Sequence, residues 1–222
     1  MSVRTIFVGD IHGCAEEFEE LLVQVDFRRG EDRLSLTGDA FSKGPAPEDV
    51  WTCIQRSGAE MVLGNHEVPL LTHLEQYAEG YSPTFEKLRH EILFEQMVPF
   101  TDALLPWLQQ LPLYMEDPDF LLVHAGINPE AGLQGTTRDQ FLAIRTWPVT
   151  KGLEGPRWHD HLEPGARPII FGHDAPGGLV LKYAGGEERP YAVGLDSGCV
   201  YGGQLSAYLL EENRIVQVES DS

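Results

Sequence analysis

Short, largely apolar segments alternate with helical patterns in the first part of this sequence. These segments cover residues 5–8, 34–36 and 61–63, and a glycine follows each one directly or within two residues. Between them, residues 18–25 and 47–56 carry apolar side chains at the spacing of a helix face. This strand–loop–helix alternation predicts a parallel sheet with crossover helices, which is an α/β fold.

The second part of the chain is expected to be helical first and then mainly strand. Residues 70–111 carry apolar residues at helical spacing. Further apolar segments cover residues 120–123, 168–171 and 191–193. Residues 204–210 and 215–218 flank a polar EENR turn, and we expect these two segments to pair as a β-hairpin.

The length of 222 residues and the hydrophobic share of 42% fit one globular domain over residues 1–222. Within it, the less regular stretch 127–167, which is rich in Gly, Pro and Trp, is expected to form a lid or small cap. No run of about 18 apolar residues is present, so no membrane span is expected. The apolar stretch near the N-terminus is too short for a signal peptide, which predicts a cytoplasmic location.

The net charge of −19 restricts the partners of this chain. A strongly acidic protein repels nucleic acid and anionic membranes unless a local basic patch reverses its field, so neither partner is expected. An anionic small molecule remains compatible with this charge, because bound divalent cations can invert the local potential. The three cysteines are scattered and indicate neither a disulfide framework nor a structural zinc site. The oligomeric state stays open.

Five apolar segments end in Gly or Val followed by a side chain that can bind a metal ion. These side chains are Asp10, Asp39, Asn65, His124 and His173, and His12 follows two residues after the first. The carboxyl ends of the strands in an α/β sheet lie along one edge, where ligands bind. Singly, each residue is explained as a helix cap, a turn residue or a packed histidine. These single explanations do not account for the occurrence of all of them together at the ends of the apolar segments.

Carboxylate, imidazole and carboxamide groups together suit a divalent ion such as Mn²⁺, Fe²⁺ or Zn²⁺. Six ligands are too many for one ion. Two ions that share an aspartate, on the order of 3.5–4 Å apart as in hydrolytic two-metal sites, account better for the set.

The ordered motifs GDIHG, GDAFSKGP, GNHE, LLVHAGI and FGHD resemble the signature of the calcineurin-like metallophosphoesterases, most closely their phosphoprotein-phosphatase branch. The ending GLDSGCVYGGQLSAYLLEE is similar to that of the bacterial symmetrical diadenosine tetraphosphate (Ap4A) hydrolases. The resemblance spans residues 6 to about 212. It implies a central β-sandwich of mixed sheets flanked by helices, with the metal site at the carboxyl ends of the strands.

The resemblance also implies roles for individual residues. The metal ligands would be Asp10, His12, Asp39, Asn65, His124 and His173. Asp39 would bridge two divalent ions, with Mn²⁺ expected and Co²⁺, Fe or Zn²⁺ as alternatives, and a hydroxide held by both would be the nucleophile. His66 would be the general acid, and Lys43 and Arg145 would bind phosphate.

Two departures from the family pattern affect these roles. Ser42 stands where the protein phosphatases of this branch have an aspartate paired with the catalytic histidine. A serine can orient an imidazole but supplies no charge, which favours a leaving group more acidic than a serine alkoxide. The second departure is GHD in place of GHT, where Asp174 is either a partner of His173 or a turn residue. Glu67 is expected either to orient His66 or to cap the following helix.

The resemblance therefore implies a metal-dependent phosphohydrolase that acts on a small nucleotide and cleaves a dinucleoside polyphosphate, Ap4A into two ADP. The alternative within the same chemistry is a protein serine/threonine phosphatase. An RNA 5′-cap hydrolase would use the same site, but the acidic charge argues against tight RNA binding. A catalytically silent nucleotide-binding module is a further alternative, and the complete set of six ligand positions argues against it.

Overall fold

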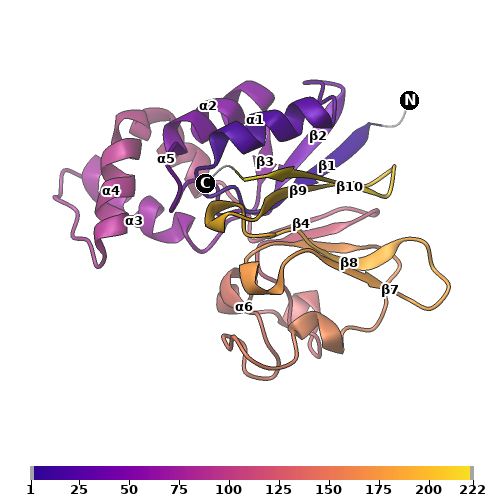
Figure 1. Ribbon diagram of the computed structural model, residues 1–222. Coiled ribbons are helices and arrows are strands. Elements are labelled where there is room, and N and C mark those ends of the chain that lie inside the picture. Colours follow the sequence, from indigo (N-terminus) through magenta and orange to yellow (C-terminus); the bar gives the residue numbers. More distant parts are fainter. Residues whose placement is uncertain (1–2, 221–222) are drawn as a thin grey trace.

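Two five-stranded mixed sheets, packed face to face, form the centre of the computed structural model, which describes residues 3–220 (Figure 1). The first sheet has the order β10-β9-β1-β2-β3, with β1 (Arg4–Val8), β2 (Asp32–Leu36), β3 (Glu60–Met61), β9 (Gln204–Leu209) and β10 (Arg214–Glu219). The second has the order β4-β5-β6-β8-β7, with β4 (Tyr114–Glu116), β5 (Leu121–Val123), β6 (Ile169–Phe171), β7 (Val180–Tyr183) and β8 (Pro190–Gly194). The α/β fold with two mixed sheets is confirmed.

The two crossover helices of the first sheet are α1 (Ala15–Gln24) and α2 (Pro47–Ser57), and they cover its outer face (Figure 1). Phe18 and Leu21 of α1 pack with Ile6 and Val8 of β1 in one buried apolar cluster. Helix α2 begins at a proline and ends before Gly58, whose φ of 74° suits the left-handed position that stops a helix. The helices predicted from the patterns at residues 18–25 and 47–56 are therefore confirmed.

Strand β1 is apolar on both faces because it lies between the helices and the second sheet. Side chains alternate along a strand, so Phe7 points away from the helices and into the space between the sheets. There its ring contacts Phe120 edge to face, with 4.8 Å between ring centroids. Tyr208 of β9 and Ile170 of β6 belong to the same buried cluster. A continuous apolar run is what a strand covered on both faces requires.

Each sheet contains three parallel strands, which are β1, β2 and β3 in the first and β5, β6 and β8 in the second. The parallel strands with crossover helices predicted for the first part of the chain are β1, β2 and β3, and antiparallel strands complete both sheets as mixed sheets. The predicted β-hairpin of β9 and β10 is confirmed. Strands β4 and β7 escape the sequence pattern because they are short, only partly buried edge strands.

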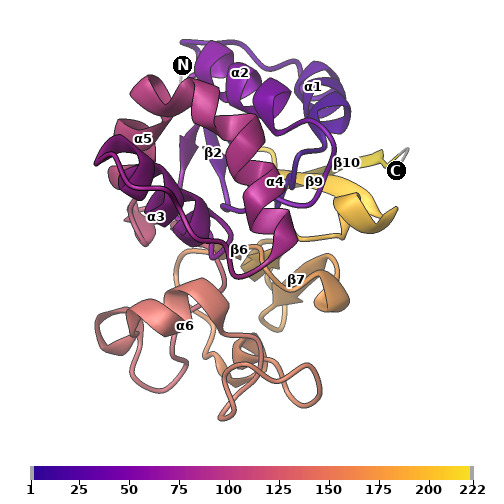
Figure 2. The ribbon, with the colours of Figure 1, turned by 90° about the vertical axis from the view of Figure 1, so that its left-hand side faces the viewer.

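The predicted helical region 70–111 consists of three helices with a non-helical stretch at residues 79–87. The helices are α3 (Glu67–Ala78), α4 (Leu88–Met97) and α5 (Thr101–Gln109). The break begins near Gly80, whose φ is +85°, and contains Pro83, which disfavours helix in the residue before it. Figure 2 shows the three helices grouped beyond one end of the first sheet.

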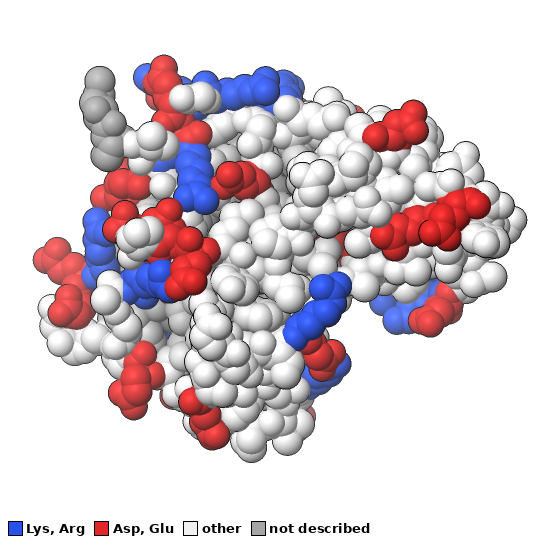
Figure 3. Space-filling model, turned by 180° about the vertical axis from the view of Figure 1, so that it is seen from behind, with Lys and Arg blue, Asp and Glu red and all other residues white. Residues whose placement is uncertain are grey.

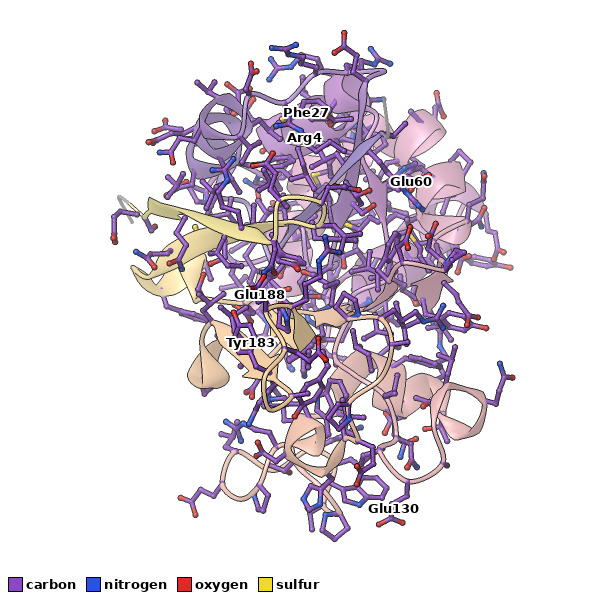
Figure 4. The ribbon with its side chains drawn as sticks, turned by 90° about the vertical axis from the view of Figure 1, so that its right-hand side faces the viewer. Arg4, Phe27, Glu60, Glu130, Tyr183 and Glu188 are labelled. Atoms are coloured by element: carbon purple, nitrogen blue, oxygen red, sulfur yellow. The ribbon has the colours of Figure 1, made fainter. Side chains whose placement is uncertain are left out.

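The segment 127–167 forms the outer layer on the second sheet and contains α6 (Arg138–Ala143) (Figure 2). Trp158 is its anchor: it is fully buried, and its ring lies 5.1 Å from that of Phe171 in β6. Glu130 lies near the far end of this layer (Figure 4) and accepts a hydrogen bond from Trp147 Nε1. Its role as a lid stays a prediction.

Basic and acidic side chains lie close together on the face shown in Figure 3, and no continuous basic patch covers that face. Many of the basic residues are ion-paired, for example Arg4 with Asp32 at 2.7 Å and Arg33 with Glu60 at 3.0 Å. Within residues 3–220, no helix combines the length and the apolar character that a membrane span needs.

Candidate metal centre

The loops that follow the parallel strands of both sheets meet at one edge of the sandwich, with Asp39 at their centre. Asp39 Oδ2 lies 3.7 Å from His12 Nε2 and 3.9 Å from His66 Nε2. Its other oxygen, Oδ1, lies 3.6 Å from His124 Nε2. One carboxylate therefore presents its two oxygens to two separate sets of imidazoles. The sequence prediction that these strand ends share one site agrees with this placement.

The two sets are His12, Asp39 and His66 on one side, and Asp39, His124 and His173 on the other. In each set, one possible ligand atom from every residue lies within 4.8 Å of the others. Asn65 joins the second set, because its Oδ1 lies 3.0 Å from His124 Nε2. His66, predicted as an acid rather than a ligand, is as close to Asp39 as His12 is.

Asp10 lies beside the second set but is engaged by protein donors. Thr37 Oγ1 donates to Asp10 Oδ1 at 2.8 Å, and the His173 backbone N–H donates to Asp10 Oδ2 at 2.9 Å. Burial, followed by the charges of Asp196 and Asp39, raises the pKa of Asp10 well above its usual range. Asp196 is buried and was not among the predicted site residues. The signal was present in the sequence, since Gly194-Leu195-Asp196 ends a strand as the other motifs do.

The histidines of the site are neutral at neutral pH, as metal ligands must be. His124 Nδ1 donates to the Thr37 carbonyl at 2.8 Å, which leaves the Nε2 lone pair directed at Asp39. Burial is the main cause that lowers the pKa of His124 to about 4, and it also lowers the pKa values of His12 and His173 well below normal. His173 Nε2 is buried and has no hydrogen-bond partner. An unpaired buried nitrogen beside a carboxylate is what a missing cation would satisfy.

Burial raises the pKa of Asp39 to about 7, against the opposing effect of a hydrogen bond from the His66 backbone N–H. A buried carboxylate needs a counter-charge to remain ionised, and a bound cation provides one. Together with the neutral imidazoles and the orphaned His173 nitrogen, this donor set fits divalent ions.

Backbone strain is concentrated in this site. Six non-glycine residues among those the structure describes have a positive φ, and His12, Asp39, Lys43 and His173 are four of them. Their φ values lie between 49° and 75°, the left-handed region that side chains with a Cβ disfavour. Strained residues persist where the surrounding structure holds them, and they gather at functional sites.

Glu67 explains how the Asp39 loop is held. Its fully buried carboxylate accepts the backbone N–H of Asp39 at 2.8 Å and that of Ala40 at 2.9 Å, and also that of Gly64 at 3.1 Å. It therefore ties the loop after β2 to the loop after β3. The expectation that Glu67 orients His66 or caps the following helix misses this role. In the sequence, the only sign of this role is the position of Glu67 in GNHE, because two of its hydrogen bonds are made with the Asp39 loop, which is distant in the chain.

Glu67→Gln is expected to lower metal affinity and activity about 10- to 100-fold, the range for residues that orient ligands. The amide would place an N–H against one of the backbone donors that the carboxylate now accepts. The free energy of unfolding should fall by about 1–3 kcal/mol. Metal titration and thermal unfolding measure both effects. Glu79→Gln, on an exposed residue at the end of α3, is the matched control and should behave as wild type.

Ser42 does not pair with His66 as the family pattern suggests for this position. Its hydroxyl lies 3.0 Å from Nδ1 of His12 instead. Burial is the main cause that lowers the pKa of His66 to about 3, and the charges of Lys43 and Arg89 lower it further. The His66 imidazole is therefore neutral at neutral pH in the free protein.

Lys43 and Arg145, the predicted phosphate-binding residues, lie at the site. Lys43 Nζ donates to His12 Nε2 at 2.7 Å, so the imidazole nitrogen of His12 already faces a positive group. Arg145 donates to the His173 carbonyl at 3.1 Å and lies 3.5 Å from Asp174. Asp174 also pairs with Arg157 at 2.6 Å. Asp174 is thus neither a partner of the His173 ring nor only a turn residue, since it holds Arg145 against the site.

Two cavities adjoin the centre, and Lys43 lines both. A small hollow of about 10 Å³, room for about one water molecule, lies beside His66 and is also lined by Arg89 and His90 of α4. A larger opening lies beside His173 and Arg145 and includes about 960 Å³ of space with its open mouth. The larger opening thus gives an anionic chain access to the centre from the side of His173.

The comparisons with known proteins agree with this geometry. The family described as calcineurin-like phosphoesterase matches residues 3–216. The chain is 29% identical to a symmetrical bis(5′-nucleosyl)-tetraphosphatase of Chromobacterium violaceum, over 94% of this chain and 92% of the relative. It is also 29% identical to the protein of that name from Aromatoleum aromaticum, over 96% of each.

Solved structures give the same result for the fold. A crystal structure whose description proposes a diadenosine tetraphosphatase superposes with a TM-score of 0.78 at 31% identity, covering 99% of this chain and 95% of that one. A metallophosphoesterase from Sphaerobacter thermophilus superposes with a TM-score of 0.57 at 14% identity, which shows a shared fold alone.

Proposed function

Because this chain belongs to the calcineurin-like phosphoesterase family, we propose that it is a metal-dependent hydrolase of dinucleoside polyphosphates that cleaves Ap4A into two ADP. The family implies divalent ions, and the observation that carries the proposal is the pair of ligand sets that share Asp39. The relatives named above, which match nearly the full chain, support the symmetrical tetraphosphatase as the type of activity.

Bound divalent ions would lower the pKa of a water molecule and neutralise phosphate charge, which is the chemistry of hydrolytic two-metal sites. Asp10, His12 and Asp39 would hold one ion, and Asp39 would hold the second together with Asn65, His124 and His173. We propose Mn²⁺ as the ion, with Co²⁺, Fe and Zn²⁺ as alternatives. Asp10 would hold the loop of His173 in place through the backbone N–H of that residue.

The side chains around the centre then bind and orient the phosphates. Lys43 and Arg145 would contact the non-bridging oxygens and stabilise the charge that develops on them. His66, on the side of the smaller hollow, would lie next to the leaving oxygen and donate a proton or a hydrogen bond to it. A nucleoside diphosphate leaves more readily than a serine alkoxide, which suits a histidine whose pKa is lowered to about 3 by burial and by Lys43.

The larger opening supports a substrate with a long anionic half. The scissile phosphates would lie at Asp39, with one half of the molecule in the opening beside His173 and the other reaching the hollow beside His66. A phosphorylated serine in a folded protein has a single phosphate and no second anionic half. The larger opening, with room for such a half, therefore favours the dinucleoside polyphosphate over the phosphoprotein.

The test is a substrate panel assayed with Mn²⁺ and again with EDTA. We expect Ap4A to give ADP as the only nucleotide product, a much lower rate on a phosphoserine peptide, and loss of both activities in EDTA. Turnover of the phosphopeptide while Ap4A survives would replace the proposal with the protein-phosphatase alternative. ATP and AMP as products would contradict symmetrical cleavage.

A further inference from the structure

Tyr201 is an exposed aromatic residue beside the metal centre that the mechanism above does not use. Its side chain is 65% exposed, and it lines the larger opening together with Lys43, Arg145 and His173. An aromatic ring exposed to water at the mouth of a polar site forgoes the free energy that burial would give it. A planar apolar group that covers the ring would recover this energy.

The loop that carries Tyr201 is held rigidly. It is a short turn, Cys199–Tyr201, between Gly198 and Gly202, which have φ values of 74° and 80°. The backbone N–H of Tyr201 donates to the Gly198 carbonyl at 2.9 Å, and Gly203 donates to the same carbonyl at 3.0 Å. Cys199 is buried in the core beneath the turn. The ring is therefore presented from a fixed backbone, which limits the entropy lost when a ligand binds.

Glycines keep the floor of the opening low next to the ring. Gly198, Gly202 and Gly203 all line it, and a Cβ at Gly198 would lie 3.9 Å from Cδ2 of the Tyr201 ring. The loop thus leaves open space beside an aromatic face, which is the shape that a flat heterocycle fills. Serine and glycine backbone groups at the rim can serve its polar edge.

Lys43 connects this ring to the phosphate chemistry. Its Nζ lies 5.3 Å from the centroid of the Tyr201 ring and 2.7 Å from His12 Nε2. One ammonium group therefore reaches both the aromatic ring and the metal centre. A ligand that combines a phosphate chain with a flat base would bridge the same two places.

We propose that Tyr201 is a stacking platform for the nucleobase of the substrate half that occupies the opening beside His173. This inference rests on the proposed function for its substrate class and adds a residue that recognises the base rather than the phosphates. Every base has an aromatic face, so the platform would bind the different nucleobases with little preference among them. Tyr201 would thereby distinguish nucleoside polyphosphates from base-free phosphate chains.

The test is calorimetric binding of ADP and of inorganic triphosphate to the Mn²⁺-loaded protein. Tyr201→Ala is expected to weaken ADP binding by about 5- to 150-fold, the range for stacking of one base on an aromatic side chain. Triphosphate binding should change by less than about two-fold, because Lys43 and Arg145 remain. Tyr201→Phe keeps the ring and should bind ADP as wild type does.

Tyr183→Ala is the matched control. Tyr183 is 51% exposed and pairs with Pro190 at the start of β8, at the opposite end of that strand from Asp196 (Figure 4). It should leave both affinities unchanged. Equal weakening of ADP and triphosphate by Tyr201→Ala would overturn the proposal, as would unchanged ADP binding or no ADP binding to wild type. If Ap4A is not hydrolysed while the ADP result holds, the proposed function fails and the platform stands.

Discussion

Asp39→Asn is expected to remove at least one metal ion and to lower kcat/KM by more than the roughly 100-fold that residues outside the ligand set cost. Asp39 lies between both ligand sets, with one oxygen toward His12 and the other toward His124. An amide of the same shape offers one neutral oxygen and one N–H group, so it cannot serve two cations. No other carboxylate has this position in the described part of the chain.

The substitution should not unfold the protein. Burial raises the pKa of Asp39 to about 7, so the ionised carboxylate is costly in the absence of a cation, and a neutral amide avoids that cost. Metal content after gel filtration, kcat/KM on Ap4A and the thermal unfolding midpoint measure the three effects. Asp119→Asn, at an exposed position before β5, is the control. Retention of both ions and of full activity would refute the bridging role of Asp39.

Gly64→Ala is expected to abolish activity by displacing the Asp39 loop. A Cβ at this position would lie 2.3 Å from the Asp39 backbone nitrogen and 2.3 Å from Glu67 Oε2. It would also lie 2.4 Å from Asp39 Oδ1, so a single methyl group meets the backbone, the positioning carboxylate and the shared ligand. Overpacking of this kind typically costs about 1–3 kcal/mol of unfolding free energy.

Gly185→Ala is the matched control, since a Cβ there meets nothing within 4 Å and the residue needs no left-handed backbone. Urea unfolding gives the stability change, and metal titration separates it from the loss of the site. An active Gly64→Ala variant with wild-type metal affinity would show that the close approach of these two loops is not required.

The strands and most helices of the first sheet follow directly from the sequence pattern. Residues 6–8 are apolar at every position because β1 is covered on both faces, and Pro47 and Gly58 bound α2 as start and stop signals. Edge strands such as β7 give a weak signal because one side and one face remain partly in water. The break at residues 79–87 interrupts a region whose apolar spacing alone indicates a continuous helix.

The site was predictable as a set of residues but not as an arrangement. Five strand ends with polar residues indicated a shared edge, and the structure brings Asp39, His124 and His173 within reach of one another. Asp196 was given no role, and the link that Glu67 makes between two loops was missed. The sequence around a carboxylate at the start of a helix does not indicate which backbone N–H groups will donate hydrogen bonds to it.

The sequence by itself determined the α/β class, the residues at the strand ends and the family, because periodicity and local motifs are properties of neighbouring residues. Only the tertiary structure decided the order of the strands in the two sheets, that Glu67 joins the Asp39 and Gly64 loops, and that Ser42 contacts His12 rather than His66. It also decided that Tyr201 lies open beside His173. These features depend on contacts between residues far apart in the chain, which are set by the packing of the sheets and the close approach of their loops.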